Sequence, residues 1–150
     1  MNIELSNLTV NVIKQSATLV TSHAEVITSN MYTLLFKKYP HLEKLFENAP
    51  NNQNVILAEA ISAYAMNIDK LHLFLPALEV IAYTHIRARI KAIHYPILGM
   101  IFIEALENTL GKKATLEFLD AWREAYKYLA NVLINMEKEI YENLALKEVL

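Results

Sequence analysis

Apolar residues recur at helical spacing along almost the whole chain, and no segment alternates apolar and polar residues for long enough to form a strand. The 150 residues include only two glycines and four prolines, so the chain has few places to turn. A hydrophobic content of 54% over this length can bury about two-thirds of the unfolded surface in one core. We therefore predict an all-α protein of six or seven helices, with residues 1–150 forming one domain.

Capping residues and prolines indicate where these helices begin and end. Ser6 and Thr115 are expected to cap the first and last helices, because their hydroxyls can accept an unpaired backbone N–H. The residue before Pro40 is disfavoured in a helix, and Gly111 is a typical helix terminator. The expected order is a helix after Ser6, a corner at Thr21–Glu25, a helix from Val26 to Tyr39, a short helix from Pro40 to Phe46, a helix from Gln53 to about Ile68, a helix led by Pro76, a helix with Pro96 in its first turn that runs to Leu110, and a helix from Leu116 to about Leu144.

The composition excludes several functional classes. A net charge of −2 and a pI near 6.2 argue against nucleic-acid binding, which needs a basic face. The absence of cysteine excludes disulfides, thiolate metal sites and cysteine nucleophiles. The N-terminus lacks the pattern of a secretory signal, and the most apolar run, Tyr95 to Ile103, is too short to span a membrane. We therefore expect a cytoplasmic protein without a transmembrane segment.

His85 is the polar residue that fits its surroundings least. On a helix it shares a face with four apolar residues, Leu78, Ile81, Ala82 and Ala88, so the imidazole is predicted to point into the interior. A buried polar group without a partner costs about 1–3 kcal/mol. The imidazole is therefore expected to have a hydrogen-bond partner or a metal.

Glu137 is the second unexpected polar residue, because its helical neighbours are Leu133, Ile134, Ile140 and Tyr141. Two explanations fit this pattern. The carboxylate either reaches water at the rim of the core, or joins His85 and Tyr95. In the second case it would accept the N–H of a metal-bound imidazole, fix its tautomer and make it a stronger electron donor.

Tyr32 and Gln53 are further candidates, since both can donate hydrogen bonds near apolar helical positions, although each alone is more typical of a surface or capping group. The other four histidines, His23, His41, His72 and His94, are expected to be solvated or locally bonded. None of the five histidines forms the paired motif of a zinc protease, and there is no glycine-rich phosphate loop or nucleophilic serine turn.

Four segments in register make the chain resemble the globin domain of bacterial flavohaemoglobins and the single-domain Vitreoscilla-type haemoglobins. The segments are Ile81–His85 (IAYTH), His94–Gly99 (HYPILG), Asp120–Tyr126 (DAWREAY) and Ile134–Tyr141 (INMEKEIY). The resemblance runs from about Ser6 to Tyr141. It implies a globin fold of six to eight helices around a pocket for haem b (iron protoporphyrin IX), with His85 as the proximal iron ligand.

The same resemblance implies roles for other residues. Tyr95 and Glu137 match the proximal pair that bonds the outer nitrogen of the imidazole, and Tyr32 matches the distal tyrosine that donates to bound dioxygen. Gln53 matches the distal glutamine, although the stretch from Phe46 to Gln53 is shorter than is usual in these relatives. The remaining matches form the haem pocket, with Phe46 against the ring, Leu57 above the iron and Ile61, Ile81, Ile90 and Leu98 as further walls.

The activity implied is that of a nitric oxide dioxygenase, which converts nitric oxide to nitrate. The chain stops near Leu150, where a flavohaemoglobin would continue into flavin and nicotinamide domains, so a separate reductase is expected. The alternative is a globin that stores, delivers or senses dioxygen, because the same pocket serves either role. A haem-free regulatory relative of the fold is a third possibility. The expected ligands are dioxygen, nitric oxide and other diatomic molecules, and the expected state is a monomer or weak homodimer.

Overall fold

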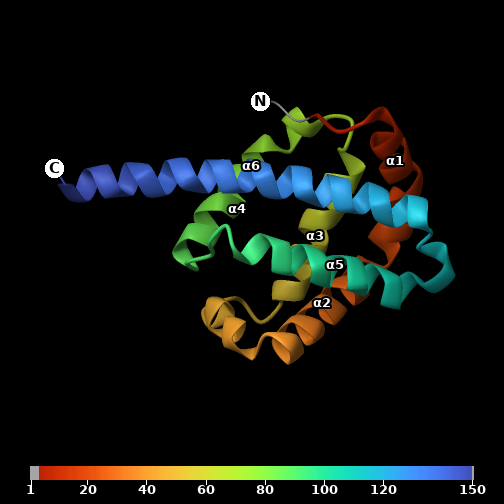
Figure 1. The fold of residues 1–150 in the computed structure, drawn as a ribbon, viewed down its shortest axis with the longest axis horizontal. Coiled ribbons are helices and arrows are strands. Elements are labelled where there is room, and N and C mark those ends of the chain that lie inside the picture. Colours follow the sequence, from red (N-terminus) through yellow and green to blue (C-terminus); the bar gives the residue numbers. More distant parts are fainter. Residues whose placement is uncertain (1–3, 150) are drawn as a thin grey trace.

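The computed structural model describes residues 4–149, and within this range the chain folds into helices joined by short connections (Figure 1). The predictions of an all-α fold and of six or seven helices are confirmed, since six α-helices are accompanied by one long and two short 3₁₀ segments in the described residues. The elements are α1 (Asn7–Ser22), α2 (Ala24–Lys38), η1 (Pro40–Phe46), α3 (Gln53–Met66), η2 (Leu71–Leu73), α4 (Leu75–Arg87), α5 (His94–Leu110), η3 (Gly111–Lys113) and α6 (Leu116–Val149).

The predicted caps are present at the start of the first helix and at the start of the last. The Ser6 hydroxyl accepts from the Thr9 backbone N–H at 3.2 Å, and the Thr115 hydroxyl accepts from that of Phe118 at 3.2 Å. Gly111 follows α5 with a φ of 57°, a left-handed conformation that glycine adopts without steric cost. These three helix boundaries were predictable because each depends on local chemistry.

Three predicted boundaries were wrong. The corner at Thr21–Glu25 is reduced to His23 alone, because the His23 Nδ1 atom meets the Leu19 carbonyl at 2.9 Å and closes the end of α1. Helix α3 ends at Met66 rather than near Ile68. Helix α6 continues to Val149 instead of ending near Leu144, since no glycine or proline interrupts it.

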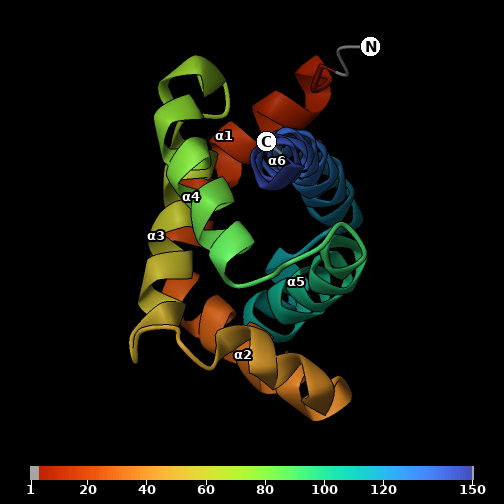
Figure 2. The ribbon, with the colours of Figure 1, turned by 90° about the vertical axis from the view of Figure 1, so that its left-hand side faces the viewer.

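The helices pack against one another in pairs. Helix α2 contacts α3 and α5, while α6 contacts α1, α4 and α5. Seen along the long axis, α3 and α4 lie on one side and α5 and α6 on the other, with α2 below them (Figure 2). Helix α6 extends along the whole molecule, and its C-terminal end projects beyond the other helices (Figure 1). Among the described residues, none of the helices combines the length and apolar character needed to cross a membrane.

Glu124 on α6 holds the start of α1. Its carboxylate accepts from the Ser6 backbone N–H at 3.0 Å, from the Ser6 hydroxyl at 3.3 Å and from the Thr9 hydroxyl. The bond from Thr9, followed by that from the Ser6 N–H, lowers the pKa of Glu124 below its ordinary value of 4.5. These bonds favour the ionised carboxylate in the folded protein.

We expect Glu124→Gln to lower the free energy of unfolding by about 1 kcal/mol at neutral pH, a modest value because the carboxylate is partly exposed. The folded state binds this proton more weakly than the unfolded state, so the stabilisation is present above pH 4.5 and is lost as the pH falls through the lowered pKa. Urea denaturation at several pH values measures the effect. A deficit that persists undiminished at low pH, or that appears equally in the exposed control Glu142→Gln, would contradict the account.

Candidate functional site

His85 lies in the last turn of α4 and faces a tyrosine and a glutamate from two other helices. Its Nδ1 atom is 2.8 Å from the Tyr95 hydroxyl of α5 and 3.3 Å from Glu137 Oε2 of α6. The Glu137 side chain is only 5% exposed, so the carboxylate does not reach water at the rim. Of the two explanations for Glu137, the structure therefore favours pairing with His85 and Tyr95.

The hydrogen-bond pattern determines which imidazole nitrogen carries the proton. Tyr95 donates its single hydroxyl proton to Glu137 Oε2 at 2.6 Å. Its oxygen can then only accept from Nδ1, so Nδ1 must be the protonated nitrogen. Nε2 consequently keeps a free lone pair, which is the form of histidine that binds a metal.

The Tyr95 hydroxyl remains a donor because its ionisation is suppressed. Burial, followed by the bond to Glu137, raises the pKa of Tyr95 well above its usual value of 10.0. A phenol that donates to a carboxylate becomes a better hydrogen-bond acceptor, so Glu137 strengthens the bond between Tyr95 and His85. The three side chains therefore form a polarised chain of hydrogen bonds that ends at Nε2.

The free Nε2 atom of His85 and the half-buried predicted pocket walls suit a large apolar cofactor. Within residues 4–149 the structure gives Nε2 no hydrogen-bond partner, and the His85 side chain is 26% exposed. No cluster of three or more histidine or acidic side chains capable of holding a metal occurs in that range, so the described residues offer no cage of protein ligands for a bare metal ion. The predicted pocket walls pack against the core but remain half-buried. They are Leu57, Ile61, Ile81, Ile90 and Leu98. A free imidazole nitrogen, in a chain whose predicted pocket walls the core leaves half-buried, fits a metal that is mostly held by its own ring, as in haem.

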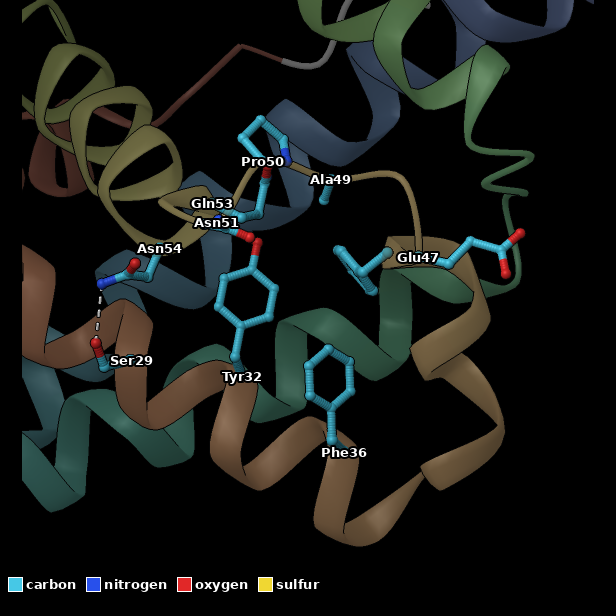
Figure 3. A pocket seen from close by; sticks show the side chains of 10 residues that line it. Ser29, Tyr32, Phe36, Glu47, Ala49, Pro50, Asn51, Gln53 and Asn54 are labelled. Atoms are coloured by element: carbon cyan, nitrogen blue, oxygen red, sulfur yellow. Dashed lines mark hydrogen bonds between the residues drawn. The ribbon is translucent and has the colours of Figure 1, made fainter.

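Three predicted residues, Tyr32, Phe46 and Gln53, together with Phe36, which the sequence did not single out, line a pocket between α2 and the start of α3. Tyr32, Phe36 and Phe46 pack ring against ring, with centroids 5.3–5.8 Å apart. Together with Gln53 they line a pocket of about 510 Å³ (Figure 3). Figure 3 shows the Tyr32 hydroxyl pointing toward Gln53 and Asn51, away from the ring of Phe36.

Tyr32 is placed to remain a hydrogen-bond donor. Burial raises the pKa of its hydroxyl above 10.0, and interaction with the Gln53 side chain offsets part of that rise. The short connection between Phe46 and Gln53 therefore does not separate Gln53 from Tyr32. His85 is not among the residues that line this pocket, so the predicted site residues fall into two groups, one around His85 and one around Tyr32. The roles assigned to the residues of both groups stay predictions.

The other histidines have local explanations, as predicted. His41 and His72 are exposed. His23 bonds to Leu19 of its own helix, and His94 Nδ1 accepts from the Lys91 backbone N–H at 2.9 Å.

Two tyrosines of α6 make contacts that the sequence did not predict. The Tyr126 hydroxyl donates to the Tyr95 carbonyl at 2.6 Å, and the Tyr141 hydroxyl donates to the Ile90 carbonyl at 3.1 Å. Both residues share a helix face with Glu137, at the positions eleven before and four after it. That spacing was the available signal.

Gly99 allows Tyr126 to approach α5. A Cβ atom at Gly99 would lie 2.6 Å from Tyr126 Cε1, so a larger residue must displace the ring. We expect Gly99→Ala to lower the stability. The overpacking costs about 1–3 kcal/mol, whereas the better helix propensity of alanine returns about 1 kcal/mol. Chemical denaturation measures the difference against Met100→Ala, a control at an exposed neighbouring position. A variant more stable than the parent would show that Tyr126 moves freely.

Comparisons with known proteins identify the family. A sequence model described as Globin matches residues 29–133. A globin-like protein of Aquifex aeolicus (strain VF5) is 42% identical over 137 residues, which are 91% of this chain and 97% of the relative. The flavohaemoprotein of Bacillus subtilis (strain 168) is 35% identical over 141 residues; these are 92% of this chain but only 35% of that protein, so the chain spans about a third of its length.

The solved structures that share this fold include two from bacteria. An engineered carbene transferase made from RmaNOD of Rhodothermus marinus, provisionally a nitric oxide dioxygenase, superposes with a TM-score of 0.91 at 36% identity, covering 94% of this chain and 99% of that one. A bacterial globin from Campylobacter jejuni gives a TM-score of 0.84 at 28% identity, covering 91% and 99%. Membership of the family implies haem as cofactor and diatomic molecules as ligands. The chain belongs to the globin family and is related to the globin domains of bacterial flavohaemoproteins.

Proposed function

We propose that the chain holds haem b through His85 Nε2, binds dioxygen on the side of Tyr32 and converts nitric oxide to nitrate when a reductase supplies electrons. The observation that carries the proposal is the hydrogen-bonded chain from Glu137 through Tyr95 to His85, which leaves Nε2 free for a metal. The half-buried walls Leu57, Ile61, Ile81, Ile90 and Leu98, with Phe46, would contact the ring. When bound, haem supplies an iron that takes a diatomic ligand and exchanges single electrons.

The residues on the two sides would favour negative charge on the ligand. Glu137 and Tyr95 draw the Nδ1 proton toward themselves, which makes His85 a stronger electron donor. Tyr32 keeps its proton and can donate a charge-assisted hydrogen bond to an anionic oxygen. Gln53 lines the same pocket and can supply a second donor.

The proposed overall reaction balances as one nitric oxide, one dioxygen and one electron giving one nitrate. The description of RmaNOD of Rhodothermus marinus as provisionally a nitric oxide dioxygenase supports this chemistry. Repeated turnover requires reduction after each cycle, so the proposal includes a reductase as the source of electrons. The cytoplasmic location and the monomeric or weakly dimeric state also stay predictions.

Rapid mixing of the oxygenated, haem-loaded protein with nitric oxide tests the proposal. With a flavin reductase and reduced nicotinamide present, we expect many nitrates per haem, with dioxygen and nitric oxide consumed in equal amounts. The protein without reductase is the control and should stop after one nitrate per haem. A reaction that stops after one nitrate even with the reductase, while the haem is being reduced, would contradict the enzyme and leave a dioxygen-binding globin.

A further inference from the structure

We propose that the groove between α5 and α6 is the surface through which two copies of this chain associate. The groove has a volume of about 590 Å³, and its lining belongs to α5, to α6 and, in Ala92, to the turn before α5. The two helices contact each other and run in opposite directions (Figure 1). This inference does not depend on the proposed function, because it uses neither the cofactor nor the residues assigned to the reaction.

The floor of the groove is mostly apolar. Gly99 of α5 has no side chain and Ala130 of α6 has only a methyl group, and Ile103 and Ile134 line the same space. Met100, which is 68% exposed, stands at the α5 edge. A methionine side chain is flexible and polarisable, so it can fill an irregular gap. Each copy therefore offers both an apolar groove and a side chain that can enter one.

The two edges of the groove carry opposite charges. Glu104 and Glu107 line it from α5, which makes that edge acidic. Arg123 and Lys127 line it from α6, which makes that edge basic. Among residues 4–149 no ion pair joins the edges, because Glu104 lies 2.6 Å from a lysine of α2 and Arg123 pairs within α6 at 2.9 Å. Glu107 and Lys127 are exposed and have no ion pair in that range, so both remain available to a partner.

This arrangement of charge favours a second copy over a small ligand. The volume lies within the range of about 300–1,000 Å³ that is usual for small-molecule pockets. A ligand with one charge, however, would be attracted by one edge and repelled by the other. In a two-fold dimer the same surface meets itself. A two-fold axis along the groove places the acidic α5 edge of each copy on the basic α6 edge of the other, so the favourable contact occurs twice.

The association should be weak and sensitive to salt. Two helix faces form a small interface, and interfaces below about 1,200 Å² belong mostly to transient complexes. Exposed ion pairs contribute little each and are screened by salt. We therefore expect a Kd between about 10 µM and 1 mM, which rises with ionic strength. Chemical denaturation at about 1 µM would then report on the monomer.

Charge reversal at the two available groups tests the interface. The variants are Glu107→Lys and Lys127→Glu, and the controls are Glu142→Lys and Lys112→Glu, which make the same charge changes at exposed positions outside the groove. Sedimentation velocity of the haem-loaded protein, from about 10 µM to 1 mM, measures the Kd. The parent should change from monomer to dimer over this range. Each groove variant should raise the Kd about five- to fiftyfold, since the symmetry repeats every change, and each control should change it less than about twofold.

A mixture of the two groove variants separates this interface from general charge effects. When Glu107→Lys meets Lys127→Glu, one of the two contacts regains the charges of the parent, and the other places the new lysine on the edge that carries the new glutamate. The mixture should therefore associate at least about fivefold more tightly than either variant alone. The mixture of the two control variants has the same net charges, and it should not associate more tightly than its components.

Three results would overturn the proposal. They are a parent that stays monomeric up to about 1 mM, an unchanged Kd in both groove variants, and a groove-variant mixture that associates no better than its components. Met100→Gln provides a test without any change of charge at an exposed position. It should also raise the Kd several-fold, because it puts a polar amide into the apolar contact, and a dimer as tight as that of the parent would again contradict the interface.

Discussion

His85→Ala is expected to abolish stable haem retention, with the affinity of the chain for haem falling by more than about 100-fold. Loss of a side chain that only supports a ligand already costs roughly 10–100-fold in metal affinity, and His85 is the proposed ligand itself. The fold should survive, because Tyr95 and Glu137 remain bonded to each other at 2.6 Å when the imidazole is removed. Titration of the haem-free chain with haemin, followed by the Soret absorbance, measures the affinity.

His41→Ala is the matched control, since His41 is exposed in η1 and has no role in the proposed site. It should bind haem with the affinity of the parent. An alanine variant at His85 that keeps its full haem with an unchanged spectrum would refute the assignment of the proximal ligand.

Tyr32→Phe is expected to speed dioxygen release by about 10- to 100-fold. A hydrogen bond to a charged group contributes about 1.5–3 kcal/mol, and every 1.4 kcal/mol corresponds to a factor of ten. The phenylalanine ring can still pack edge-on against Phe46, where the centroids are 5.3 Å apart, so the pocket should keep its shape. Displacement of dioxygen by carbon monoxide in a stopped-flow instrument measures the dissociation rate.

Gln53→Leu provides the comparison for this prediction, because Gln53 lines the same pocket and also carries a donor. We expect its effect to be smaller than that of Tyr32→Phe, since the Tyr32 ring packs against the rings of Phe36 and Phe46, which fixes the direction of its hydroxyl. An unchanged rate in Tyr32→Phe with fast release in Gln53→Leu would transfer the distal hydrogen bond to Gln53.

Much of the fold was predictable because it depends on residues that are near one another in the sequence. Ser6, Thr115 and Gly111 act on their own turn of helix, and their positions were correct. The short corner at His23 was not predicted correctly, because a single imidazole that bonds to the Leu19 carbonyl ends α1 where several turn residues are usually needed. The length of α6 was also underestimated, since its final residues continue as helix without the apolar periodicity on which the prediction relied.

The candidate site was predictable where a residue type was unusual for its position. An imidazole and a carboxylate in apolar frames led to His85 and Glu137, and the structure brings them together with Tyr95. The hydroxyl contacts of Tyr126 and Tyr141 were not predicted, because a tyrosine at the edge of a core is ordinary. Their hydroxyls bond to the backbone of Tyr95 and Ile90, and such contacts carry no residue-type signal at the receiving position. The contact of Glu124 with Ser6 and Thr9 was not predicted either, because it joins residues that are far apart in the sequence.

The iron–histidine stretching frequency of the ferrous protein, measured for the parent and for Glu137→Gln, tests the central claim most directly. Glutamine keeps the size of Glu137 but lacks the negative charge that draws the Nδ1 proton of His85. The account predicts a clear band in the parent and a band at lower frequency in Glu137→Gln, with one haem still bound per chain. The same frequency in both proteins would show that Glu137 does not act on His85, despite lying 3.3 Å from it.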